Sequence, residues 1–452
     1  HMERNLTTGS ITRNVLAFSL PYLLSYFLQT LYGMADLFII GQFEGKASTT
    51  AVAVGSQVMH MLTVMIVGLA MGTTVSIGQA VGSEDRKRAS ACTGNTVTLF
   101  LGLSLVLTAA LLCLRRPIVA LLSTPAEAVE GTVAYLTVCF IGIPFITAYN
   151  ILSSIFRGLG DSKSPMYFIA VACAVNIGLD LLFMGPMHLG PVGAALGTTL
   201  SQAVSVAVSL LVIVKRNTGI SLTKADLRPD RAVMGRLLKI GVPIALQDGF
   251  IQVSFMVITI IANRRGLTDA AAVGIVEKMI GFLFLVPSSM LSTVSALGAQ
   301  NIGAGKPERA RATLGCAIAI TLGFTSLIVI LVEFLAEPMV GLFTPDEAVV
   351  LAGGQYLRGY IWDCFFAGVQ FSFSGYFCAI GRSGLSFLHN TLSILLIRIP
   401  GAYLASRFFP ATLLPMGLAN AAGSLFSILV CLIAYGALLR AERRGHGALS
   451  DR

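Results

Sequence analysis

Long apolar runs separated by short polar segments repeat along the whole chain. Runs such as 58–81, 91–114 and 196–214 reach the length of about 20 residues that an α-helix needs to cross a bilayer. They do not alternate in the short segments typical of a transmembrane barrel. The pattern predicts an all-α integral membrane protein with about twelve transmembrane helices. The expected spans are 14–43, 50–81, 91–114, 130–156, 164–186, 190–215, 237–264, 268–299, 312–335, 350–376, 384–407 and 412–439.

Composition and charge support this class and exclude others. Hydrophobic residues make up 55% of the chain and charged residues only 12%, whereas soluble domains carry about a quarter charged residues. The net charge of +9 does not indicate nucleic-acid binding, because the Lys and Arg residues gather in loops between apolar runs. Alternate loops and both terminal segments hold most of them, for example Arg86, Lys87 and Arg88. By the positive-inside rule both termini are predicted to be cytoplasmic.

The two halves of the sequence resemble each other. Thr-Val-Ser at 74–76 recurs at 293–295, and Thr-Pro-Ala-Glu-Ala-Val at 124–129 recurs as Thr-Pro-Asp-Glu-Ala-Val at 344–349. Pro21 matches Pro243, and all these offsets lie between 219 and 222 residues. Because each half holds six expected crossings, the two six-helix lobes enter the membrane in the same sense, which is the parallel-repeat plan of transporters.

The repeat and a basic midpoint segment define the expected domains. The chain is divided into a cytoplasmic tail at 1–13, a first lobe at 14–215, a cytoplasmic linker at 216–236, a second lobe at 237–439 and a cytoplasmic tail at 440–452.

Polar residues at membrane depth are few in the first lobe. Asp36 interrupts the first span and shares a helix face with Gln29 and Tyr32. A carboxylate at that depth costs roughly 2.5–3.5 kcal/mol or more, so a functional role is the default hypothesis. Pro21 is the expected bend of this span.

Three more polar residues complete the first-lobe set. Asn176 and Asp180 are four residues apart on the fifth span, and Thr198 lies on the sixth. Packed against Asp36, they would combine two carboxylates, an amide oxygen and a hydroxyl. Such a set can take up a proton near neutral pH, or its oxygens can ligate a small hard cation such as Na⁺. The alternative is that Asn176 and Asp180 only tie helices together.

The second lobe does not repeat this set. The positions that match Gln29 and Asp36 hold Ile251 and Ile258. Its acids accompany bases, which predicts mutual neutralisation; the residues concerned are Glu277, Lys278, Arg358, Asp363 and Arg398. A sharper hypothesis is that acids of this lobe contact a cationic substrate in a cavity with an adaptable methionine wall. The candidate cavity residues are Asp248, Met256, Trp362 and Asp363.

The ordered set of motifs resembles the multidrug and toxic compound extrusion (MATE) family over about 15–439. The matching features are Pro21, Gln29, Tyr32 and Asp36 in the first span, Ala-Val-Gly at 53–55, Gln-Ala-Val-Gly at 79–82, Phe-Arg-Gly-Leu-Gly-Asp at 156–161, and Asn176 with Asp180. Among its branches the set is most similar to the DinF-like one. A seventh-span glutamate of NorM-like members has no counterpart near Ile251.

The resemblance implies two six-helix lobes around a central cavity, and export of drug-like, often cationic compounds in exchange for H⁺ or Na⁺. It also implies that Asp36, Asn176, Asp180 and Thr198 form the cation site, with Tyr32 and Gln29 beside it. The implied protein is a monomer in the bacterial inner membrane, in contact with lipids and with no cofactor beyond the coupling ion.

The alternative of another class is a flippase of lipid-linked precursors on a related fold, which would need bases such as Arg358 and Arg398 to hold phosphates. No nucleotide-binding loop or nucleophile constellation indicates an enzyme.

Overall fold

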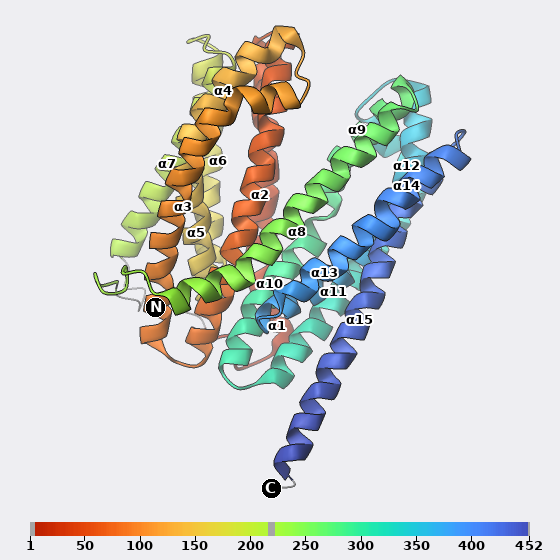
Figure 1. Ribbon diagram of the computed structural model, residues 1–452. Coiled ribbons are helices and arrows are strands. Elements are labelled where there is room, and N and C mark those ends of the chain that lie inside the picture. The colour runs from red at the N-terminus through yellow and green to blue at the C-terminus, as the bar shows by residue number, and fades with distance from the viewer. Residues whose placement is uncertain (1–4, 216–221, 451–452) are drawn as a thin grey trace. The chain divides into compact units, whose positions relative to one another are not determined.

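The computed structural model describes residues 5–215 and 222–450, and every regular secondary-structure element in this part of the chain is a helix (Figure 1). In chain order the elements are α1 (Ile11–Phe43), α2 (Lys46–Gly82), α3 (Arg86–Leu121), the 3₁₀ turn η1 (Ala126–Ala128), α4 (Val129–Ile141), α5 (Ile143–Gly158), α6 (Lys163–Met184), α7 (Pro191–Lys215), α8 (Arg231–Asn263), α9 (Leu267–Leu283), α10 (Leu285–Gly303), α11 (Pro307–Gly341), α12 (Glu347–Ala379), α13 (Ser383–Ser393), the π-helical turn η2 (Ile394–Arg398), α14 (Ile399–Phe408) and α15 (Leu414–Ser450).

The helices coincide with the expected membrane spans. Among the described residues, nine helices are long and apolar enough to cross a membrane, and counting each of two bent pairs as one span gives eleven. The 33-residue α12 falls outside this count and carries Arg358 and Asp363 along its length. It corresponds to the expected span 350–376. The prediction of an all-helical membrane protein is therefore confirmed.

Two expected spans are broken rather than continuous. Span 130–156 bends by 50° between α4 and α5, and span 268–299 bends by 42° between α9 and α10. Each second helix contains a proline in its first turn, Pro144 or Pro287, which has no N–H to continue the hydrogen-bond ladder. The sequence pattern alone did not predict these breaks, because the apolar residues run through them.

Polar side chains at the helix starts fix where several helices begin. Asp85 caps α3 by accepting from the backbone N–H of Arg88 at 3.1 Å, and Asp346 caps α12 by accepting from Ala348 N–H at 3.0 Å. Such caps contribute about 1 kcal/mol each by satisfying N–H groups that have no partner within the helix.

The chain forms two compact units. The first unit consists of residues 1–245 and 295–310, and the second of 246–294 and 311–452. The predicted lobes at 14–215 and 237–439 and the linker at 216–236 remain predictions. Residues 1–4, 216–221 and 451–452, which belong to the predicted tails and linker, lie outside the described residues. The end of the linker is helical, since α8 begins at Arg231, and α15 continues to Ser450 through most of the predicted C-terminal tail.

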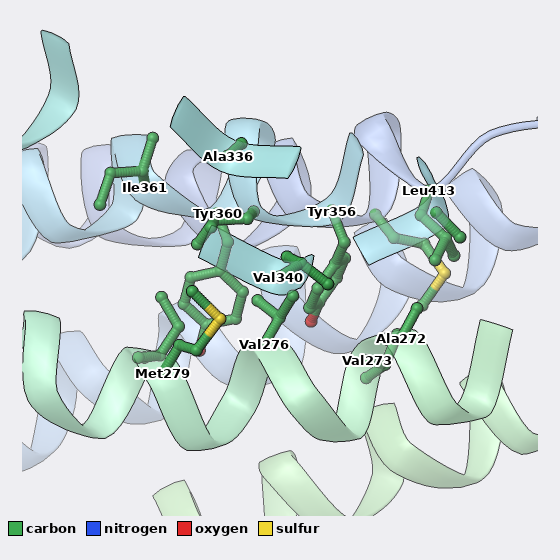
Figure 2. Packing of buried hydrophobic residues seen from close by; sticks show 14 of the residues in the cluster. Ala272, Val273, Val276, Met279, Ala336, Val340, Tyr356, Tyr360, Ile361 and Leu413 are labelled. Carbon is green, nitrogen blue, oxygen red and sulfur yellow. The ribbon is translucent and has the colours of Figure 1, made fainter. Parts of the chain in front are cut away.

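Each unit has its own apolar core. In the first unit, Ile40 of α1, Leu136 and Phe140 of α4 and Ala194 of α7 are completely buried in one cluster. In the second unit, Val276 of α9 packs beside Tyr356 and Tyr360 of α12 (Figure 2). In lipid, close packing rather than the exclusion of water holds such helices together.

Apolar side chains also cover the outside of the helices. On α11, Leu327 and Phe334 are 63% and 79% exposed. Large exposed apolar residues of this kind are typical of surfaces that contact lipid. None of the eight cysteines forms a disulfide within the described residues.

Candidate functional site

Asp36 lies buried on α1, and two other helices supply its hydrogen bonds. Its side chain is 3% exposed. The amide of Asn176 on α6 donates to Asp36 Oδ1 at 3.0 Å, and the hydroxyl of Thr198 on α7 donates to Oδ2 at 2.9 Å. Each carboxylate oxygen thus receives a hydrogen bond from a different helix. The structure therefore brings together three of the predicted site residues.

Asp180 lies one turn after Asn176 and is completely buried. Neither of its carboxylate oxygens has a hydrogen-bond partner among the described residues, and the same is true of Asn176 Oδ1. The carboxyl groups of Asp180 and Asp36 are close enough to interact directly. A buried carboxylate without a partner is strongly unfavourable, so this position favours a bound proton or cation.

Gly197 on α7 makes the close approach of these groups possible. A Cβ atom at this position would lie 2.2 Å from Asp180 Oδ1 and 3.3 Å from Asn176 Oδ1. The backbone of α7 therefore packs directly against the two side chains of α6, with no room for a larger residue.

Tyr32 connects α1 to α7 beside the acids. Its hydroxyl lies 3.2 Å from Ser201 Oγ, donates to the Thr198 carbonyl at 3.3 Å, and accepts from the Gln202 amide at 3.5 Å. Ser201 and Gln202 were not predicted from the sequence. Their spacing of three and four residues from Thr198 places them on the same helix face, which is the signal that could have indicated them.

Gln29 and Pro21 lie before Asp36 in α1, closer to the start of the helix. Gln29 is half-buried, and its side chain forms no hydrogen bond with the described residues. Pro21 stands within the helix, and its carbonyl accepts from Ser25 Oγ at 3.0 Å. The Arg157 guanidinium of α5 lies 4.6 Å from the ring centre of the neighbouring Tyr22.

The four predicted cavity residues of the second unit lie on α8 and α12. Asp248 is half-buried, Met256 and Trp362 are 42% and 37% exposed, and Asp363 is 2% exposed. No hydrogen bond or ion pair within the described part of the chain joins these side chains to one another. Substrate contact through them remains a prediction.

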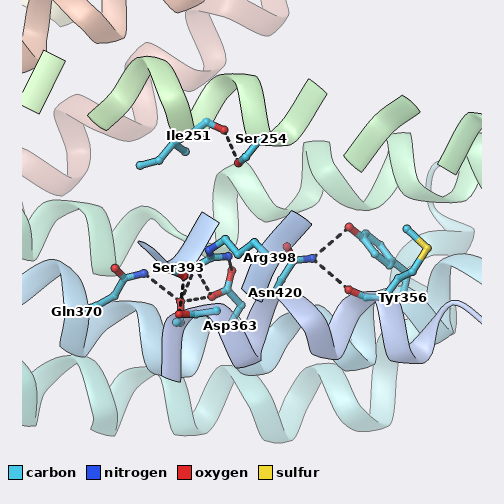
Figure 3. A network of polar contacts seen from close by, with 11 residues as sticks. Ile251, Ser254, Tyr356, Asp363, Gln370, Ser393, Arg398 and Asn420 are labelled. Atoms are coloured by element: carbon cyan, nitrogen blue, oxygen red, sulfur yellow. Dashed lines mark hydrogen bonds and ion pairs between the residues drawn. The ribbon is translucent and has the colours of Figure 1, made fainter. Parts of the chain in front are cut away.

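Ion pairing in the second unit follows the predicted neutralisation only in part. Asp363 pairs with Arg398 (Figure 3), and Arg358 pairs with Glu337 at 3.5 Å. Neutralisation of Glu277 by Lys278 is wrong. Within the described residues Glu277 has no ion pair and accepts only from Thr259 Oγ1 at 3.4 Å, because adjacent residues of a helix point in different directions.

Comparison with known proteins relates both halves to one family. The MatE family model matches residues 21–182 and again residues 243–404. The chain belongs to the MatE family. Members of this family are ion-coupled membrane transporters and not enzymes.

Relatives and solved structures agree with this membership. The chain is 28% identical to the "Probable multidrug resistance protein YpnP" of Bacillus subtilis (strain 168), over 88% of each chain. It is 24% identical to the "Multidrug export protein MepA" of Staphylococcus aureus (strain N315), over 82% of each. The crystal structure of "MATE in the straight conformation" matches with a TM-score of 0.90 at 23% identity, covering 96% of this chain and 98% of that one. This likeness confirms the MatE fold.

Proposed function

We propose that this MatE protein is a secondary active exporter of drug-like organic compounds, driven by exchange for H⁺ or Na⁺. Family membership supports ion coupling, and the names of the two bacterial relatives support multidrug export. Exported compounds are expected to be often cationic, as the resemblance to the MATE family implies.

The observation that carries the proposal is the pair of buried acids in the first unit. Asp36 has a donor for each oxygen, whereas Asp180 has none within the described residues. Two buried carboxyl groups in contact cannot both stay ionised without a compensating positive charge. We assign the coupling site to Asp36, Asn176, Asp180 and Thr198, with Tyr32 holding α1 against α7.

The donor set fits either coupling ion. A proton would bind one carboxylate and let it donate to the other. A sodium ion would use carboxylate, amide and hydroxyl oxygens, the hard donors that such ions prefer. Among the residues that the structure describes, no group of three or more His, Cys, Asp or Glu side chains is placed to hold a metal ion.

Coupling requires that the ion and the substrate bind with different affinities in two conformations. Asp36 lies four turns after Pro21, at which the hydrogen-bond ladder of α1 is interrupted. We propose that ion binding changes the bend of α1 at Pro21 and thereby reshapes the substrate cavity. Asp248, Met256, Trp362 and Asp363 remain the proposed cavity residues of the second lobe.

Several finer assignments belong to the same proposal. We place the chain in the DinF-like branch, because it has the four first-lobe site residues and has Ile251 and Ile258 in the matching second-lobe positions. The expected protein is a monomer of two six-helix lobes in the bacterial inner membrane, with both termini cytoplasmic by the positive-inside rule.

The ion pairs of the second unit weigh against a phosphate-binding flippase. Arg398 is paired with Asp363 and Arg358 with Glu337, so the two bases that would favour a phosphate ligand already have acidic partners. No other observation favours that alternative.

The proposal is tested by transport into everted membrane vesicles that contain the protein. Ethidium uptake is measured with an acidic lumen, with a Na⁺-loaded lumen and with neither gradient. One gradient should drive uphill uptake, and its collapse should reverse it. Equal equilibration of ethidium under all three conditions would rule out ion-coupled export.

A further inference from the structure

The second unit contains a buried ion pair built from three elements. Asp363 of α12 accepts hydrogen bonds from both terminal nitrogens of Arg398: Nη1 donates to Oδ2 at 3.2 Å and Nη2 donates to Oδ1 at 3.3 Å. Ser424 of α15 donates to Asp363 Oδ1 and accepts from Arg398 Nη2 at 2.8 Å and from Gln370 Nε2 at 3.0 Å. This network leaves Gln370 Oε1 buried and without a partner among the described residues.

The backbone around the arginine is shaped to hold it. Arg398 ends the π-helical turn η2 (Ile394–Arg398), which interrupts the helical span from α13 to α14. On the facing helix α15, a Cβ atom at Gly423 would lie 2.4 Å from Arg398 Cγ. The Gly423 carbonyl is fixed by Ser393 Oγ at 2.7 Å. Only glycine at position 423 leaves room for the arginine side chain.

By the spacing of the internal repeat, Arg398 occupies the position that corresponds to Asn176 in the first unit. The two family matches begin at residues 21 and 243 and end at 182 and 404, a spacing of 222 residues at both ends. Arg398 follows Asn176 by the same 222 residues, and Ile258 follows Asp36 by 222. A π-helical turn adds one residue to a helix, which accounts for the change from the spacing of 221 between Gly160 and Gly381.

The two repeats therefore differ in the group that lies beside the buried acid. In the first unit an amide ligand, Asn176, stands beside acids that lack a fixed cation. In the second unit the matching position carries a guanidinium, which is always charged and cannot dissociate from the protein. Bidentate pairing of this kind is among the strongest charge-assisted contacts.

We propose that Arg398 is a built-in cation that fills the ion position of the second unit and thereby confines the transported ion to the first. The inference rests on the proposed ion coupling and goes beyond it, because it assigns one coupling-ion site to the chain and gives the reason. Arg398 acts as a specificity-determining residue: without it, Asp363, Ser424 and Gln370 would present free oxygens to a small cation.

Other titratable groups surround the pair and must be considered in any test. The groups that interact electrostatically with Asp363 or Arg398 are Tyr356, Tyr360 and Cys364 of α12 and His389 of α13, and Glu277 of α9 interacts with the two tyrosines.

The test is the reaction of the purified full-length protein with dicyclohexylcarbodiimide, which modifies protonated carboxyl groups in apolar surroundings, followed by peptide mass spectrometry. Loss of a contacting opposite charge raises the ratio of protonated to ionised carboxylate by about tenfold or more. Asp363 should therefore react little in the wild-type protein and at least about tenfold more in Arg398→Ala. In Arg398→Ala with Asp363→Asn, no modification should occur at position 363. Equal reaction of Asp363 in the wild type and in folded Arg398→Ala would overturn the proposal.

A second pair of variants keeps the test valid if Arg398→Ala does not fold. Gly423→Ala should push the arginine away from Asp363 and expose the acid to reaction, whereas Gly436→Ala on the same helix has no atom within 4 Å and should behave as wild type. Lack of reaction in a folded Gly423→Ala protein would count against the proposal. Modification of Asp36 and Asp180 in the same digests reports separately on the first-unit site, so failure of either assignment is distinguishable.

Discussion

Asp180 differs from the other acids of the first unit in what its oxygens contact. Asp85 and Asp161 accept hydrogen bonds from backbone N–H groups at helix starts, and Asp36 accepts from Asn176 and Thr198. Asp180 is completely buried, and in the described part of the chain no group donates a hydrogen bond to its oxygens. The sequence predicted that these groups share a site, from their depth and helical spacing and from the family resemblance. It did not predict which acid lacks a donor, because that depends on side-chain orientation.

The contact between Gly197 and Asp180 gives a prediction at this scale. Gly197→Ala places a methyl group where Asp180 Oδ1 lies, 2.2 Å away, so the carboxyl group must move. Since misplacement of a reacting group by about 1 Å can cost roughly 100-fold, we expect gradient-driven ethidium transport to fall roughly 10- to 100-fold at equal expression. Gly178→Ala on α6, with no atom within 4 Å, is the matched control. Wild-type transport by Gly197→Ala would show that the position of Asp180 does not matter.

At the scale of elements, the helix boundaries were largely predictable and the interruptions were not. α6 spans Lys163–Met184 against the expected 164–186, and α7 begins at Pro191 against the expected 190, because the extent of the apolar run sets these boundaries. The bend between α4 and α5 has Pro144 in the turn that follows it, and the π-helical turn η2 ends at Arg398, where Gly423 of α15 packs closely against it. A continuous run of apolar residues does not record such packing.

Pro21 interrupts the backbone hydrogen bonds of α1, so its replacement tests whether bending of this helix matters for transport. Pro21→Ala restores a backbone N–H and favours an unbroken helix by about 3 kcal/mol. If bending of α1 couples the ion to the substrate, this variant should transport ethidium more slowly while Asp36 still reacts with dicyclohexylcarbodiimide as in the wild type. The repeat-related Pro243→Ala in α8 serves as the comparison and should have the smaller effect. Equal losses of transport in the two variants would contradict a special role of Pro21.

At the scale of the whole molecule, the two repeats share their helical plan but not their chemistry. The family model matches both halves, yet Asp36 and Asp180 of the first unit form no ion pair within the described residues, whereas Asp363 of the second unit pairs with Arg398. The sequence predicted the repeat, the loss of the Asp36 counterpart at Ile258 and a tendency toward neutralisation. It did not predict the bidentate geometry or the role of Gly423, since both arise from contacts between helices that are distant in sequence.

The buried acids of the first unit, Asp36 and Asp180, are proposed to couple an ion to export. The most direct measurement is gradient-driven ethidium transport by Asp36→Asn and Asp180→Asn in everted vesicles, at equal expression and beside the control Asp161→Asn, whose amide oxygen can still cap α6. We predict that the two site variants lose uphill transport and that the control keeps it. Uphill transport at the wild-type rate by Asp36→Asn or Asp180→Asn would contradict the claim.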